Sequence, residues 1–475
     1  MNFKTIYKNI SILGIGQIVM ILFAIGKSKV AAEFLSVEGI GLIFALASTI
    51  GIIGTICNFG LGTLATRDVS SLFKNDDNLF LKEISVYRLL AIVSGVLGLL
   101  LILLFSNKIG VVTFGNSEYN LYIILLCVMP LLSQYNTSQF AILQATRNFS
   151  SLTKSNIFSS FCVLLSAVFL YYYYGEIGVP YVIIASALFP VVFNTIFLGK
   201  LNIDRVRISY STVYERFILL VKRGSFVSFA NSLPNVTVYL ITIFLIKEEG
   251  LITSGLFACA YTITSSFINL IISTLNPEFL SRISSQIDRN NINEHIKDQT
   301  KLVVHIISPI LIILISSSSL LIRTFYNEDF LVSTSVLILL LSSIVIKTLL
   351  WVVNYIYIVM KDEILFFAVE LLLSVSIYLL IYLFYPIFNL EAIGFSYLIS
   401  YSLVIVVSSV LVSIKYRMNL SLNTLWNIAP NILFVFIASY LNFRGREFAS
   451  SYFLITTFIA SAVTSIFYLK KTLSI

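Results

Sequence analysis

Apolar residues occur along this chain in long, regularly interrupted runs. From Ser11 to Leu469, stretches of roughly 20–28 apolar residues follow one another with only short polar interruptions. A helix needs about 20 apolar residues to cross the hydrocarbon core of a bilayer. In lipid only helices and closed barrels satisfy every backbone polar group, and barrel strands alternate in polarity over about 10 residues. The pattern therefore predicts an all-α polytopic membrane protein.

The runs predict about fourteen transmembrane helices. Their expected bounds are 9–35, 39–66, 85–105, 119–146, 155–174, 178–199, 223–246, 251–280, 302–322, 332–360, 364–385, 389–414, 424–442 and 449–469. The polar stretch 200–222 follows the sixth helix and divides the chain. We therefore expect two six-helix bundles, over 1–210 and 211–418, and an additional helix pair over 419–475.

A short motif recurs after the first and the seventh predicted helix. Gly41–Ala45 is echoed by Gly255–Ala258, which begins 214 positions later. Both helices are predicted to start on the same side of the membrane. The two halves would then be parallel repeats, related by an axis along the membrane normal.

Lysine and arginine are distributed unevenly between the predicted loops. One set of loops, together with both termini, carries 22 of them, and the opposite set carries five. Because cytoplasmic loops are the enriched ones, we expect both termini in the cytoplasm. Lys4 and Lys8 precede an apolar run without a cleavage motif, so the first helix is expected to be retained. This asymmetry explains the net charge of +8 without a nucleic-acid partner.

Composition excludes several function classes. Charged residues make up 11% of the chain, far below the roughly 25% of soluble domains. The four cysteines lie in apolar segments, which argues against disulfide bonds and zinc sites. No Walker-type nucleotide motif occurs, and the loops are too short for a soluble catalytic domain. We expect no enzyme activity, no catalytic residue, no metal and no cofactor.

Four segments resemble the polysaccharide flippase (O-antigen transporter) family of the multidrug/oligosaccharidyl-lipid/polysaccharide exporter superfamily. They are Glu38–Leu42, Asn58–Gly62, Leu143–Phe149 and Leu321–Phe330. The resemblance implies two bundles around a central cavity that opens alternately to the two sides. It also implies transport of an undecaprenyl-pyrophosphate-linked oligosaccharide, such as an O-antigen unit of lipopolysaccharide, across a bacterial cytoplasmic membrane. The substrate, membrane lipid and other polysaccharide assembly proteins are the partners we expect.

Ionisable residues within membrane helices are the first candidates for a substrate site. Lys347 lies near the middle of its helix, and Trp351 and Asn354 follow on the same face. The alternative for Lys347 is an ion pair with Glu370. The two residues lie about 22 Å and 12 Å from the turn between their helices, so we do not expect them to be level.

Further cavity candidates lie on other helices. Lys29 has an ion-pair partner, Glu33, four residues further on. Lys27 has no acidic residue at that spacing, so it is the better cavity candidate of the two. Amides are expected to line the cavity at Asn231, Asn235 and Gln134, with helix–helix hydrogen bonding as the alternative for Gln134.

Pro234 interrupts the backbone hydrogen bonds of the seventh predicted helix, so it is a candidate hinge, with a static kink as the alternative. Arg67, Arg88 and Arg147 lie at the predicted cytoplasmic mouth. Guanidinium groups bind phosphate oxygens well, so these residues are candidates for recruiting the diphosphate. The positive-inside rule explains them equally.

Three other function classes remain open. Two belong to the same superfamily: a lipid II-type flippase, suggested by the fourteen-helix count, and a cation or drug antiporter. The antiporter would favour acidic cavity residues over the central Lys347. A membrane polysaccharide polymerase or glycosyltransferase is a distant alternative, because it would need a sizeable external loop.

The topology can be tested with reporter fusions. Fusions at Asn116, Arg323 and Arg446 should report an external location, because they follow an odd number of predicted crossings. Fusions at Arg289 and Ile475 should report a cytoplasmic one. An external C-terminus would remove one of the last two helices from this topology.

Overall fold

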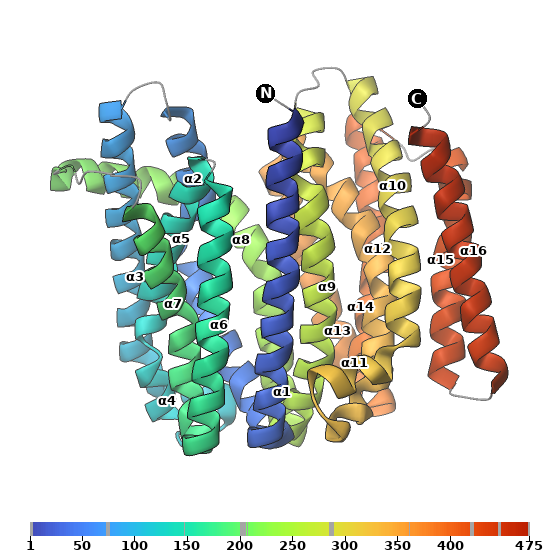
Figure 1. Cartoon of the computed structure of the whole chain (residues 1–475), viewed down its shortest axis with the longest axis horizontal. Coiled ribbons are helices and arrows are strands. Elements are labelled where there is room, and N and C mark those ends of the chain that lie inside the picture. The colour runs from blue at the N-terminus through green and yellow to red at the C-terminus, as the bar shows by residue number, and fades with distance from the viewer. Residues whose placement is uncertain are drawn as a thin grey trace. The chain divides into compact units, whose positions relative to one another are not determined.

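The computed structural model describes residues 3–72, 77–146, 148–199, 206, 208–284, 289–360, 362–418, 422–444 and 448–473. Nearly all of these residues are helical, and strands are absent from the described ranges (Figure 1). The predicted all-α fold class is confirmed.

The helices follow one another along the chain with short connections. They are α1 (Phe3–Ile56), α2 (Leu61–Leu72), α3 (Asp77–Phe114), α4 (Asn120–Leu125), α5 (Val128–Ala145), α6 (Phe149–Tyr174), η1 (Gly175–Gly178), α7 (Val179–Gly199), α8 (Tyr210–Glu249), α9 (Leu251–Ser284), α10 (Arg289–Ser316), α11 (Ser318–Phe325), η2 (Glu328–Ser333), α12 (Thr334–Val359), α13 (Glu363–Phe388), α14 (Glu391–Tyr416), α15 (Leu422–Arg444) and α16 (Phe448–Leu473).

Eleven ranges of the described chain are long and apolar enough to cross a membrane, and Leu454–Ile466 is a shorter apolar helix. Two of the eleven, with 41 and 51 residues, exceed twice the length of one crossing. The first contains Ser36, whose backbone is left-handed (φ 61°), and the second contains η1. Counting two crossings in each of these ranges gives thirteen, and the shorter helix Leu454–Ile466 brings the number to the predicted fourteen.

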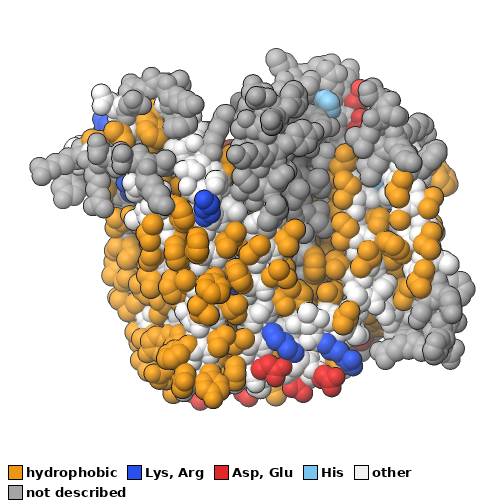
Figure 2. All heavy atoms as spheres, viewed as in Figure 1, with side chains coloured by type: hydrophobic (Ala, Val, Ile, Leu, Met, Phe, Trp, Pro, Cys, Tyr) orange, Lys and Arg blue, Asp and Glu red, His pale blue; other side chains and the backbone are white. Residues whose placement is uncertain are grey.

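The surface of the described part is strongly apolar. Hydrophobic side chains cover much of the face shown in Figure 2, and charged side chains gather towards the edges of this apolar surface. Leu104 and Ile414 are 76% and 75% exposed. Water-soluble proteins rarely expose such extended apolar surface, so lipid must cover these side chains.

The chain forms two compact units, Met1–Gly255 and Leu256–Ile475. In the first unit, α1 packs against α6 and α8, and α5 packs against α3 and α7. The contact of α8 with α1 and α3 places it in this unit. The repeat boundary near residue 210 and the separate helix pair 419–475 stay predictions.

In the second unit, α12 is the central helix. It packs against α10, α13, α14 and α15. A helix that is apolar on every side is expected to be buried, and α12 has buried residues all along its length. The polar side chains of Ser342, Ser343, Thr348 and Asn354 are therefore enclosed by protein, whereas Lys347 is half-buried.

An acidic residue fixes the turn that follows α12. Asp362 caps α13 by accepting a hydrogen bond from the Leu365 backbone N–H at 3.4 Å. Its other carboxylate oxygen accepts from Lys415 and Tyr416 at the end of α14. The bonds from Lys415 and Tyr416 lower the pKa of the Asp362 carboxyl.

Gly41 and Gly255, one from each copy of the recurring motif, each pack against the backbone of the helix that carries the other. A Cβ on Gly41 would lie 2.0 Å from the Leu251 carbonyl oxygen, and one on Gly255 would lie 2.1 Å from the Val37 carbonyl oxygen. Residues 37 and 251, like 41 and 255, are 214 positions apart. The contact is therefore reciprocal, as two repeats related by a twofold axis would make it.

Alanine at Gly41 should destabilise the protein, because a Cβ there meets a rigid backbone oxygen. Overpacking of this kind typically costs about 1–3 kcal/mol, so the melting temperature in detergent should fall. Gly51→Ala is the matched control, since nothing lies within 4 Å of that position. Gly255→Ala should resemble Gly41→Ala, and unchanged stability in both variants would contradict the close backbone contact.

Candidate functional site

Lys347 occupies the middle of α12 and is half-buried. Its Nζ lies 5.8 Å from the ring centroid of Tyr401 on α14, within the range of a cation–π interaction. The Tyr401 side chain is buried. Among the described residues, no carboxylate lies within 4.0 Å of the Lys347 ammonium.

Glu370 on α13 is held by Asn354 instead of by Lys347. The Asn354 Nδ2 donates to Glu370 Oε1 at 3.0 Å, and its Oδ1 accepts from the Ser408 hydroxyl at 3.3 Å. The Tyr357 hydroxyl in turn donates to the Ser408 carbonyl at 3.2 Å. These bonds link α12, α13 and α14. They engage both the nitrogen and the oxygen of the Asn354 amide.

Aromatic side chains neighbour Lys347 on α12 and α14. Trp351 is half-buried and meets Tyr355 edge to face, with ring centroids 5.2 Å apart. On α14, the ring centroids of Tyr397 and Tyr401, which are one helical turn apart, are separated by 5.9 Å. Sequence reasoning missed Tyr401. The sequence does show two tyrosines four residues apart in a predicted membrane helix, but this spacing does not indicate which residue they contact.

Lys27 lines a cavity of about 240 Å³ in the first unit. The polar residues around it are Asn156, Ser159, Ser160 and Ser186, on α6 and α7. The predicted ion pair between Lys29 and Glu33 is present at 3.2 Å. Lys27 therefore stands in a partly polar recess, while its neighbour is neutralised locally.

Gln134 on α5 lies at a break in the second crossing. The backbone leaves helical geometry between α1 and α2, where Phe59 and Gly60 have φ of 47° and 75°. Gln134 Nε2 donates to the Gly54 carbonyl at 2.7 Å, and its Oε1 accepts from Asn58 at 2.9 Å. Gln134 is 2% exposed, which corresponds to the helix–helix bonding that the sequence left as an alternative.

The candidates on α8 form a separate, exposed group. Asn231, Pro234 and Asn235 are all exposed, whereas Ser232 between them is buried. The helix runs through Pro234 without interruption from Tyr210 to Glu249. The hinge role of Pro234 stays a prediction.

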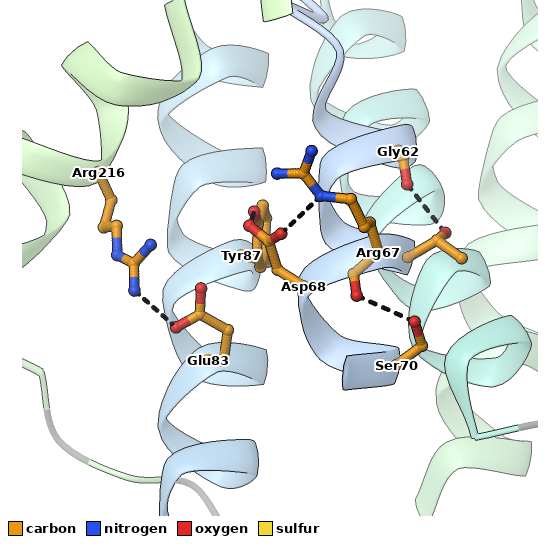
Figure 3. Close-up of polar contacts among 8 residues, drawn as sticks. Gly62, Arg67, Asp68, Ser70, Glu83, Tyr87 and Arg216 are labelled. Atoms are coloured by element: carbon orange, nitrogen blue, oxygen red, sulfur yellow. Dashed lines mark hydrogen bonds and ion pairs between the residues drawn. The ribbon is translucent and has the colours of Figure 1, made fainter. Parts of the chain in front are cut away.

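Arg67 is oriented by its neighbour Asp68 in the middle of α2 (Figure 3). Its Nε lies 3.0 Å from Asp68 Oδ1, and the Tyr87 hydroxyl donates to the other carboxylate oxygen at 2.7 Å. In Figure 3 the two terminal nitrogens of Arg67 point away from Asp68, and the side chain is 63% exposed. This leaves the guanidinium fork accessible.

The other predicted arginines differ from Arg67. Arg88 on α3 donates to the Gln139 side chain at 3.5 Å, and Arg147 lies outside the described residues. Arg216 on α8, which was not predicted as a site residue, pairs with the buried Glu83 at 3.2 Å (Figure 3). This ion pair fastens the start of α8 to α3.

The predicted residues thus fall into separate groups. Lys347, Trp351 and Asn354 share α12 in the second unit. The remaining described candidates lie in the first unit, in the recess around Lys27, at the helix break, on α8 and near Arg67. The second-unit group combines a cation with aromatic faces, and the cation suits an anionic ligand.

Comparison with known proteins gives both a family and a fold. A sequence profile described as "Polysaccharide biosynthesis protein" matches residues 30–335. None of the curated protein sequences compared with the chain matches it.

Solved structures match over most of the chain. A structure of the lipid II flippase MurJ in an inward closed conformation has a TM-score of 0.72 at 16% identity, covering 98% of this chain and 99% of that one. An inward-facing multidrug resistance MATE family transporter of the MOP superfamily has a TM-score of 0.63 at 13% identity, covering 84% and 96%. The Vibrio cholerae MATE transporter VcmN gives 0.63 at 12%, covering 87% and 97%. The fold is therefore that of these transporters.

Loss of the Gln134 amide should destabilise the first unit. Gln134→Leu leaves the Gly54 carbonyl and the Asn58 amide without their partner, and such a loss typically costs about 1–3 kcal/mol. Gln144→Leu on the same helix is the control, because Gln144 is exposed. Thermal unfolding in detergent should separate the two variants. Equal melting temperatures would show that water or another side chain replaces Gln134.

Proposed function

The chain belongs to the polysaccharide biosynthesis protein family, and we propose that it is a flippase. Its substrate would be an undecaprenyl-pyrophosphate-linked oligosaccharide repeat unit, such as an O-antigen unit, moved from the inner to the outer leaflet by alternating access. The observation that carries this proposal is Lys347, an ammonium group at mid-membrane without a carboxylate within 4.0 Å among the described residues.

Flipping such a lipid poses an electrostatic problem. The diphosphate is anionic and the sugars are hydrated, so neither enters hydrocarbon unaided. Lys347 lies about 18 Å along the helix axis from either end of α12, too far for its ammonium to reach an interface. A charge in that position is costly and is retained where it meets a substrate or ion pathway. A cation there would offset the diphosphate charge during crossing.

The other candidates take supporting roles in this proposal. The Lys27 recess and the amides of Asn231 and Asn235 would contact the headgroup or its sugars as the protein changes state, while Gln134 would hold the helix break. Trp351 would contact the headgroup or its sugars beside Lys347. Arg67, Arg88 and Arg147 would recruit the diphosphate, and Pro234 would bend α8.

A lipid II-type flippase is the second candidate. The MurJ structure covers 98% of this chain, against 84% and 87% for the two MATE transporters. The extra coverage favours a fold with the additional helix pair. A cation or drug antiporter shares the fold but would have to tolerate Lys347 at its centre.

The proposed setting follows from the substrate. The protein would lie in a bacterial cytoplasmic membrane with both termini inside, in contact with membrane lipid and with other polysaccharide assembly proteins. Deleting the gene should cause lipid-linked repeat units to accumulate on the cytoplasmic side. Accumulation of lipid II instead would favour the second candidate, and accumulation of neither would exclude both flippases.

Replacing Lys347 should disable transport more than folding. Lys347→Ala should lower export of the oligosaccharide by about 10- to 100-fold, the worth of one hydrogen bond to a charged group. Lys347→Arg should keep part of the activity, and Lys108→Ala, an exposed lysine on α3, should keep all of it. The measurement is surface polysaccharide relative to protein inserted in the membrane. Full export by Lys347→Ala would remove this residue from the mechanism.

A further inference from the structure

Glu370 is an ionisable group in the second unit to which the proposed function gives no role. It is located on α13, within a range long and apolar enough to cross a membrane. A carboxylate at such a depth is costly unless it is paired or serves a function. Its carboxylate lies beside Asn354, about two turns from Lys347 along α12, and Lys347 and Glu370 do not form a salt bridge of 4.0 Å or less in the described structure.

Opposite charges in a medium of low dielectric constant attract one another strongly, because the Coulomb energy scales inversely with that constant. Lysine and glutamate side chains are long and have several rotatable bonds. With about 10 Å along the helix axis between Lys347 and Asn354, Lys347 and Glu370 can pair only if both side chains turn towards each other. A restraint on each side chain prevents this.

Asn354 supplies the restraint on the glutamate. Its Nδ2 donates to Glu370 Oε1 at 3.0 Å, and Asn354 is 5% exposed. The Ser408 hydroxyl donates to the Asn354 Oδ1. Because an amide oxygen facing Glu370 would repel the carboxylate, this hydroxyl fixes the amide in the orientation that donates.

Tyr401 supplies the restraint on the lysine. Its ring lies 5.8 Å from the Lys347 Nζ and is itself buried on α14. An aromatic face attracts an ammonium without accepting a conventional hydrogen bond from it. The donors of Lys347 therefore stay available.

We propose that Asn354 and Tyr401 are positioning residues that keep Glu370 from neutralising Lys347, so that the ammonium can bind the diphosphate of the substrate. Glu370 then acts as a counter-charge at a distance. It balances the buried ammonium without occupying its donors. This inference rests on the proposed function, and it gives Asn354 an internal role in place of contact with the sugar.

The test is binding of farnesyl diphosphate to the purified full-length protein in detergent. Asn354→Leu removes the restraint at nearly constant volume, so Glu370 should pair with Lys347 and affinity should fall at least tenfold. Adding Glu370→Gln to Asn354→Leu removes the competing carboxylate. Affinity should then return to within threefold of that of Glu370→Gln alone.

A purely structural role for Asn354 predicts the opposite result. The double variant would then bind as weakly as Asn354→Leu or more weakly, and this outcome would overturn the inference. Ser408→Ala is a smaller change that removes the hydroxyl that orients the amide and also meets the Tyr357 hydroxyl at 3.0 Å. It should lower affinity about threefold, whereas Ser402→Ala, whose hydroxyl bonds its own helix at Leu398, should not. Equal affinities for these two serine variants would also contradict the restraint.

Lys347→Ala separates this inference from the proposed function. If Lys347→Ala binds farnesyl diphosphate like the wild type, the proposed role of the cation fails. If Lys347→Ala loses binding while Asn354→Leu keeps it, only the restraint fails. Tyr401→Phe should bind normally and Tyr401→Leu weakly, because the ring and not the hydroxyl faces the ammonium.

Discussion

The cost of placing an ammonium group in hydrocarbon governs the arrangement of the second unit. Among the described membrane spans, the one that contains Lys347 is the most buried, and neither aqueous interface is within reach of the ammonium. The side chains around it compensate this cost in part without cancelling the charge. Tyr401 offers a π face, and Glu370 offers a negative charge that Asn354 holds in place. Each of these groups makes sense only in relation to the ammonium.

The absence of water from the hydrocarbon core also constrains the backbone of the first unit. Where the second crossing leaves helical geometry near Phe59 and Gly60, carbonyl groups lose their partners inside the helix. Gln134 and Ser94 supply donors to the Gly54 and Cys57 carbonyls. In membrane proteins, irregular backbone persists where neighbouring side chains satisfy it in this way. Polar residues of these helices thus serve the backbone as well as any ligand.

The sequence predicts the fold well because one constraint dominates it. A crossing needs a fixed length of apolar helix, so hydropathy alone locates the helices, and the pair of Lys29 and Glu33 follows from local helical spacing. Lys347 stands out because ionisable groups are rare in such helices.

Other parts of the candidate site could not be predicted. The contact with Tyr401 and the bond from Asn354 to Glu370 depend on how three helices are rotated about their axes. Apolar helices tolerate many rotations, so hydropathy does not fix this angle. The helix break beside Gln134 lies within a predicted crossing. Asn58, Gly60 and Gly62 are residues typical of turns, but hydropathy alone does not show that the helix ends there.

The glycine contact carries a consequence for how the chain can vary. Gly41 faces the backbone around Gly255, and Gly255 faces the backbone around Gly41, which is an isologous contact like those across the axis of a symmetric dimer. A side chain gained by either glycine must displace the backbone of the other helix. The two positions therefore constrain each other, and neither can change alone without moving α1 away from α9.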